Sequence, residues 1–268
     1  MSKKVEKIHR FDIPERIEHI VLMVTFTLLA MTGLAQKYAM QNWAISMVDM
    51  FGGIESMRVI HRYAATALMA LVIYHGGNLT YKLFVLRQPA YMMLRFDDAR
   101  DLWGVMKYNL GLSKEHPQMG RFNFEEKLEY WAVLWGMAVM IITGFMLWNP
   151  ITTSKFLPGA FIPAAKTAHG GEALLAVLAI IIWHFYNTLT HLNFSIFTGW
   201  IKRQTMTEKH AVELEAIDTG NLPERPTPEE YKKRMNRFIP WSVVMTILLV
   251  AFLIWFVTFE QTAITTLP

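Results

Sequence analysis

Cysteine is absent from this chain of 268 residues. Without a thiol the chain can form no disulfide, ligate no iron–sulfur cluster through cysteine, attach no c-type haem covalently and offer no thiol nucleophile. Charged residues are also few: Asp, Glu, Lys and Arg make up 18% of the chain, and they avoid its long apolar stretches. Histidine and methionine are the protein ligands that remain for a redox metal inside those stretches, and histidine is the better placed.

Apolar residues dominate instead. The chain is 53% hydrophobic and 13% aromatic, and its mean hydropathy is positive, which is typical of a multi-span membrane protein and not of a soluble domain. Stretches long enough to cross a hydrocarbon layer of ~30 Å predict five spans, at 17–36, 57–86, 128–148, 165–193 and 238–259. The first span contains His19 and lacks a small-residue cleavage site, so we do not expect a cleaved signal peptide.

Lysine and arginine predict the orientation of these spans. The N-terminal tail carries five, the connections Lys82 to Lys127 and Lys202 to Arg237 carry eight each, and the other two connections carry two each. By the positive-inside rule the N-terminus and both basic connections are cytoplasmic, and the C-terminus is external. We therefore expect a multi-pass protein surrounded by lipid in a prokaryotic cytoplasmic membrane. The pI near 9.2 follows from these segments, and no basic stripe interleaved with exposed aromatics indicates nucleic acid.

The predicted organisation follows from the spans and the charges. The chain is expected to consist of a cytoplasmic tail (1–16), a first transmembrane hairpin (17–86), a cytoplasmic interfacial connection (87–127), a second hairpin (128–193), a cytoplasmic segment (194–237) and a fifth transmembrane helix with a short external end (238–268).

Two of the spans each carry a pair of histidines. His61 and His75 are fourteen residues apart, and His169 and His184 are fifteen apart. On a helix this spacing corresponds to about 21–22 Å and nearly a whole number of turns, so each pair lies on one face, near opposite sides of the membrane. Two facing helices with such pairs can hold two haems, because imidazole is a normal axial ligand of haem iron. A single histidine in a membrane is often a packing residue, but two matched pairs favour ligation.

The chain also repeats itself. At an offset of 111, Arg10 aligns with Arg121, Glu18 with Glu129, and Thr32-Gly33 with Thr143-Gly144. The histidines align at slightly smaller offsets: His61 with His169 at 108, and His75 with His184 at 109. Repeats of this kind usually assemble about a pseudo-two-fold axis. The predicted fold is an all-α integral membrane protein, with a four-helix haem-binding bundle of two repeated helical hairpins and a fifth transmembrane helix outside it.

Three segments resemble a known family. They are similar to segments of the membrane cytochrome b subunits of respiratory formate dehydrogenases and nickel–iron hydrogenases. These segments open the first three spans and are residues 16–19 (Arg-Ile-Glu-His), 57–61 (Met-Arg-Val-Ile-His) and 121–131. Residues 197–199 match the same family. The resemblance covers residues 10–215. It implies two haems b, a menaquinone or ubiquinone site near the cytoplasmic face, and a redox partner subunit carrying iron–sulfur clusters or c-type haems.

The resemblance and the repeat assign the inner haem differently. In the formate dehydrogenase type, the inner ligands would be His19 and His184. In the arrangement that resembles the cytochrome b of bc complexes, His61 would pair with His169 for the outer haem and His75 with His184 for the inner one. The repeat favours His75 and the family motif favours His19; we prefer His75 and keep both.

A quinone site is expected at the inner end. Quinone reduction takes up two protons with two electrons, and titratable groups close to the inner haem meet that need. His191, Arg16 and Glu18 are the candidate residues. The connection between the hairpins contains two further segments, 91–96 and 102–108. Their aromatic and methionine residues, mixed with basic ones, predict helices that lie in the membrane interface.

These observations predict an electron-transfer subunit of a membrane respiratory oxidoreductase complex, which passes electrons across the membrane between a redox partner and the quinone pool. Two alternatives stay open: a stand-alone transmembrane haem reductase of an external acceptor, and a proton-coupled transporter in which the histidines relay protons. A b-type reduced-minus-oxidised spectrum separates the transporter from the other two.

Overall fold

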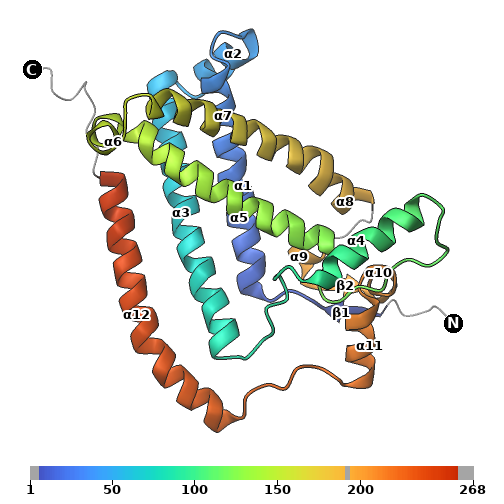
Figure 1. The fold of residues 1–268 in the computed structure, drawn as a ribbon. Helices are drawn as coiled ribbons and strands as arrows, with labels where there is room; N and C mark the ends of the chain where they lie inside the picture. Colours follow the sequence, from blue (N-terminus) through green and yellow to red (C-terminus); the bar gives the residue numbers. More distant parts are fainter. Residues whose placement is uncertain (1–5, 191–193, 259–268) are drawn as a thin grey trace, which may run out of the picture. The chain divides into compact units, whose positions relative to one another are not determined.

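The computed structural model describes residues 6–190 and 194–258. The regular secondary structure of the described residues is helical apart from two short strands (Figure 1). In chain order the elements are β1 (Lys7–His9), α1 (Ile13–Lys37), α2 (Asn42–Met50), α3 (Ile54–Phe84), α4 (Phe96–Asn109), α5 (Phe124–Trp148), α6 (Pro150–Phe156), α7 (Phe161–Ala179), the π-helical η1 (Ile180–His184), α8 (Phe185–Thr190), α9 (Ser195–Thr198), β2 (Trp200–Lys202), α10 (Arg203–Lys209), α11 (Ala211–Thr219) and α12 (Pro228–Thr258).

Within the described residues, four helices are long and apolar enough to cross a membrane: α1, α5, the continuous run Phe161–Leu189, and α12. Few of their residues are buried within the chain, as expected where lipid covers apolar surface. Helix α3 has 31 residues, enough to span, but it is more polar because it carries His61, Arg62 and His75. The all-α integral membrane class is confirmed, and a fifth crossing by α3 remains a prediction.

By their internal contacts the residues form two compact units. The first contains the chain up to Arg16 together with 80–134 and 184–235; the second contains 17–79, 135–183 and the chain from Asn236 onward. Helices α1, α3 and α5 each have their apolar middle in the second unit.

In the second unit, α1 packs against α3, and α5 packs against α7 and α12. Hydrogen bonds join the helices of each hairpin, and the Phe145 and Phe256 rings lie with their centroids 4.8 Å apart. The N-terminal side of α3 and the end of α1 meet α2 in a core in which Ala35, Ala44 and Met57 are fully buried. Each predicted hairpin therefore has internal contacts that hold its two helices together.

In the first unit, β1 and β2 form a two-stranded antiparallel sheet in which Ile8 pairs with Ile201. Ile201 packs with Met206 and Leu214 of the helices that follow. The helical pattern of the sequence did not predict these strands. They form because both segments lie outside the apolar helices, where the backbone groups of a non-helical segment must find partners in another segment.

The connection between the hairpins contains one helix, not two. The 102–108 prediction falls within α4, but 91–95 are not helical, so the prediction for 91–96 was wrong. The Asp98 carboxylate accepts a hydrogen bond from the Arg95 backbone N–H at 2.6 Å and thereby fixes the start of the helix at Phe96. Asp98 also receives the Lys127 ammonium group at 2.6 Å, which attaches α4 to the beginning of α5.

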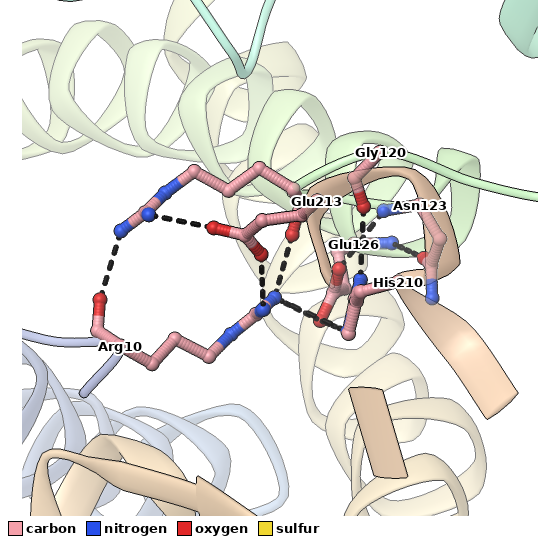
Figure 2. A network of polar contacts seen from close by, with 7 residues as sticks. Arg10, Gly120, Asn123, Glu126, His210 and Glu213 are labelled. Atoms are coloured by element: carbon pink, nitrogen blue, oxygen red, sulfur yellow. Dashed lines mark hydrogen bonds and ion pairs between the residues drawn. The ribbon is translucent and has the colours of Figure 1, made fainter. Parts of the chain in front are cut away.

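A buried ionic cluster joins the starts of the two repeats to the tail (Figure 2). Arg10 donates to the Arg121 carbonyl at 2.6 Å, and Arg121 donates to the Arg10 carbonyl at 2.8 Å. Both guanidinium groups also donate to the Glu213 carboxylate of α11, one to each oxygen, at 3.0 and 2.8 Å. Since the two arginines are equivalents at the repeat offset of 111, Glu213 lies where a local pseudo-two-fold axis would pass.

His210 completes this cluster and is fully buried. Its Nδ1 lies 3.1 Å from the Gly120 carbonyl and its Nε2 lies 3.2 Å from an Arg10 nitrogen (Figure 2). The carbonyl needs a donor and the guanidinium needs an acceptor, so the ring is neutral with its proton on Nδ1. Burial, with the nearby Arg10 charge, lowers the pKa of His210 to about 3.

Candidate haem site

The first candidate ligand, His61 of α3, is oriented by α1. Its Nδ1 lies 2.8 Å from the Thr32 hydroxyl oxygen, and this hydroxyl lies 2.6 Å from the Leu28 carbonyl. A hydroxyl has one proton, and the carbonyl can only accept, so Thr32 donates to Leu28 and accepts from the imidazole N–H. His61 is thereby fixed with its proton on Nδ1, which leaves the lone pair of Nε2 for a metal.

The second repeat builds the same arrangement around His169 of α7. The Thr143 hydroxyl of α5 lies 2.9 Å from its Nδ1 and 2.6 Å from the Val139 carbonyl, so the same argument assigns the proton to Nδ1. A glycine follows each threonine. A Cβ atom on Gly33 would lie 3.1 Å from the His61 ring, and one on Gly144 would lie 3.3 Å from the His169 ring. Glycine therefore lets each ring approach the neighbouring helix.

His61 and His169 are brought together, with ring centroids 6.4 Å apart. Two imidazoles on opposite sides of one iron atom would have their centres about 6 Å apart, because each metal–nitrogen bond is about 2 Å and each ring centre lies a further ~1 Å away. The separation and the lone pairs on both Nε2 atoms fit a bis-histidine haem between the two hairpins.

His75, further along α3, has an acidic partner. Its Nδ1 lies 2.7 Å from one carboxylate oxygen of Glu18 on α1, and the Asn78 amide donates to the other oxygen at 2.6 Å. The Glu18 side chain is only 12% exposed. A carboxylate that accepts from Nδ1–H again leaves Nε2 as the ligating nitrogen, in the geometry usual for metal-bound histidine.

His184 has the equivalent partner in the second repeat. Its Nδ1 lies 2.9 Å from a carboxylate oxygen of Glu129 on α5. The residues Ile180–His184 form a π-helical turn, which takes up more residues than an α-helical turn because its hydrogen bonds run from i to i+5. This turn accounts for the spacing of fifteen residues between His169 and His184, against fourteen in the first repeat.

The remaining sequence candidates have different surroundings. His19 is half-buried on α1, next to Glu18. The Arg16 guanidinium donates to the Phe197 carbonyl, its Nε at 3.0 Å, and so holds the segment that precedes β2. His191 lies outside the described residues.

The profile of the prokaryotic cytochrome b561 family matches residues 10–199. The chain belongs to this family. It is therefore a multi-pass membrane cytochrome b, and the family implies haem b as its cofactor. The matched region contains the four candidate ligands His61, His75, His169 and His184.

Relatives of this cytochrome b are named as subunits of formate dehydrogenases. The cytochrome b556(fdo) subunit of formate dehydrogenase from Escherichia coli K12 is 25% identical over 190 residues, which are 70% of this chain and 81% of the relative. The nitrate-inducible cytochrome b556(Fdn) subunit of the same strain is 21% identical over 69% of this chain and 79% of its own. The cytochrome b556 subunit of Haemophilus influenzae formate dehydrogenase is 22% identical over 67% of this chain and 70% of its own. These names support the predicted resemblance to formate dehydrogenase subunits.

Sequence reasoning named the histidines but gave no role to most of their partners. The Thr32-Gly33 and Thr143-Gly144 pairs are typical of close helix approach or of clearance for a porphyrin edge, which does not predict the hydrogen bonds of the threonines to the imidazoles, and no contact of Glu129 with His184 was predicted. The repeat offset contained the signal, because Thr32 with Thr143, and Glu18 with Glu129, recur at the same offset of 111 as the arginines.

Proposed function

We propose that this cytochrome b is a dihaem subunit of a respiratory oxidoreductase complex and carries electrons across the membrane between a redox partner subunit and the quinone pool. The observation that carries the proposal is the fourfold pattern at Nδ1: each of the four histidines has a hydroxyl or carboxylate partner there, which leaves Nε2 for iron. Haem, when bound, supplies one-electron redox chemistry, and the chain supplies ligands, spacing and insulation.

The residue roles follow from the local geometry. His61 and His169 would hold the outer haem, and Thr32 and Thr143 would keep their rings in one tautomer and one orientation. His75 and His184 would hold the inner haem, as the repeat predicts. The two depths of the ligands, about 21 Å apart along a helix, would place the two haems in series across the bilayer.

The haem number is tested by a pyridine haemochrome assay on the purified protein. We expect two haems b per chain, and we expect His61→Ala to remove about half of the haem while the other centre keeps its spectrum. His116→Ala is the matched control, because His116 is exposed on the loop after α4 and should leave the haem content unchanged. One haem or none in the unsubstituted chain contradicts the proposal.

The inner ligand is tested by two parallel variants. His75→Ala should lose one haem and His19→Ala should keep both, because the Glu18 carboxylate accepts a hydrogen bond from Nδ1 of His75. The opposite result would assign the inner haem to His19 and His184, the arrangement expected from the formate dehydrogenase resemblance. His184→Ala should lose the inner haem under either assignment.

We propose that menaquinone or ubiquinone exchanges electrons at the inner end, with Glu18 and His191 close to the ring. Arg16 donates to the Phe197 backbone carbonyl, so its proposed role is to fix the backbone beside the quinone site and not to contact the quinone. A quinone-analogue inhibitor should shift the spectrum of the inner haem, and Glu18→Gln should weaken its effect. A shift confined to the haem held by His61 would place the quinone at the other end.

The partner and the orientation complete the proposal. The relatives belong to formate dehydrogenases, so we expect a redox partner with iron–sulfur clusters or c-type haems, identified by copurification from native membranes.

We expect a cytoplasmic N-terminus and an external C-terminus. A C-terminal reporter active on the cytoplasmic side would contradict a fifth crossing; residues 259–268 themselves lie outside the described residues. Membership of a cytochrome b family favours electron transfer over the transporter alternative.

A further inference from the structure

The four histidines fall into two chemical classes according to the group that accepts from Nδ1. His61 and His169 have neutral hydroxyl partners, from Thr32 and Thr143, at 2.8 and 2.9 Å. His75 and His184 have carboxylate partners at 2.7 and 2.9 Å. The two hydroxyls are equivalent residues of the two repeats, and so are the two carboxylates. The partner of a histidine, hydroxyl or carboxylate, therefore depends on the position of the histidine along its helix and not on which repeat it belongs to.

A carboxylate and a hydroxyl act differently on an imidazole ligand. A negative acceptor on Nδ1–H draws the proton toward itself and raises the electron density on Nε2, which makes the histidine a stronger donor to iron. A stronger donor stabilises the ferric state, because that state carries one more positive charge than the ferrous state. The carboxylate charge favours the ferric state directly as well, and weak screening in a low-dielectric surrounding enlarges this effect.

The structure shows how these carboxylates are held. The Glu18 side chain is 12% exposed and the Glu129 side chain is 27% exposed, so both are largely removed from water. The Asn78 amide donates to the second oxygen of Glu18 at 2.6 Å and holds this carboxylate in place. The threonine hydroxyls bring no charge, and each of them has its single proton engaged by a carbonyl of its own helix.

We infer that Glu129 is a positioning residue that sets the haem held by His184 at a lower reduction potential than the haem held by His61 and His169. This inference rests on the proposed dihaem function. It assigns the difference between the two potentials to Glu129, Thr32 and Thr143, whose side chains do not touch iron. Glu129 acts on His184, which is an inner ligand whether its partner histidine is His75 or His19.

The test is a spectroscopic redox titration of the purified protein, with each haem assigned by the single-histidine variants. The unsubstituted chain should titrate in two one-electron steps, and the lower step should belong to the haem lost in His184→Ala. Glu129→Gln should raise the potential of that haem alone, and Glu129→Asp should largely restore it. Thr143→Val should move only the higher step, because its partner ligates the other haem. Glu125→Gln, one helical turn before Glu129 on α5, is the matched control and should move neither step.

The outcomes separate this inference from the function on which it rests. A chain with fewer than two haems would contradict the dihaem proposal itself. A chain with two haems but one unresolved step, or with the lower step belonging to His61 and His169, would overturn the inference alone, and so would a Glu129→Gln protein with an unshifted lower step. If Glu129→Gln does not retain haem, the order of the two steps in the unsubstituted chain decides the question independently of any variant.

Discussion

Glu213 should determine how firmly the tail that follows the fourth predicted span stays docked. Its carboxylate receives the guanidinium groups of Arg10 and Arg121 at 3.0 and 2.8 Å, and its side chain is 10% exposed, while that of Arg10 is 2% exposed. Removing one partner of a buried ion pair costs ~3–5 kcal/mol because the other charge is left uncompensated. Glu126 remains 3.7 Å from Arg10 and compensates part of this charge, so we expect about 3 kcal/mol for Glu213→Gln, at the low end of that range.

The assay is hydrogen–deuterium exchange of the peptide that contains α11, in detergent or nanodiscs. A loss of about 3 kcal/mol corresponds to a local opening equilibrium roughly 150-fold more favourable. Glu215→Gln is the matched control, because Glu215 lies on the same helix with an exposed side chain. Equal exchange in the two variants, or unchanged exchange in Glu213→Gln, would refute the idea that the ionic cluster holds the tail.

Three further predictions address other parts of the chain. The pKa of His210 is lowered to about 3 in the folded state against an ordinary value near 6.5. Its neutral form therefore contributes stability that is complete above pH 6.5 and falls by about 1.4 kcal/mol per pH unit below it. The opening equilibrium of α11, from exchange corrected for the intrinsic rate at each pH, should rise from pH 6 to pH 4 less steeply in His210→Asn than in the unsubstituted chain; equal slopes would contradict this role of His210. Gly33→Ala should crowd the His61 ring, cost about 1–3 kcal/mol and reduce bound haem, whereas Gly77→Ala, with no atom near its Cβ, should not; equal haem in both would contradict the crowding. Since the chain has no cysteine, spin labels at Trp103→Cys and Asp97→Cys can test whether α4 lies in the membrane interface: the first should be oxygen-accessible and the second water-accessible, and two water-accessible labels would contradict this placement.

The sequence alone determined the membrane class, and it predicted the two repeated hairpins and the candidate ligands. These properties depend on composition and on periodicity along one helix, both of which can be read without knowing how helices pack. The spacing of His61 and His75 placed them on one face, and the repeat offset located His169 and His184. An offset of 111 marked Arg10 and Arg121 as equivalents, and the structure shows each donating to the other's carbonyl.

Only the tertiary structure decided which group each of these side chains meets. Glu18 and His75 are 57 residues apart, and whether the carboxylate reaches that ring depends on the axial shift between α1 and α3, which periodicity leaves undetermined. The second repeat has one more residue between its histidines than the first, and the π-helical turn Ile180–His184 takes up this residue, so that His184 keeps the direction it would have after fourteen residues of α-helix. No residue pattern in 180–184 predicted this turn. Glu213 could satisfy its charge in water as well as against two arginines; the docking of α11 removes the water, and the arginines then become the partners available to it.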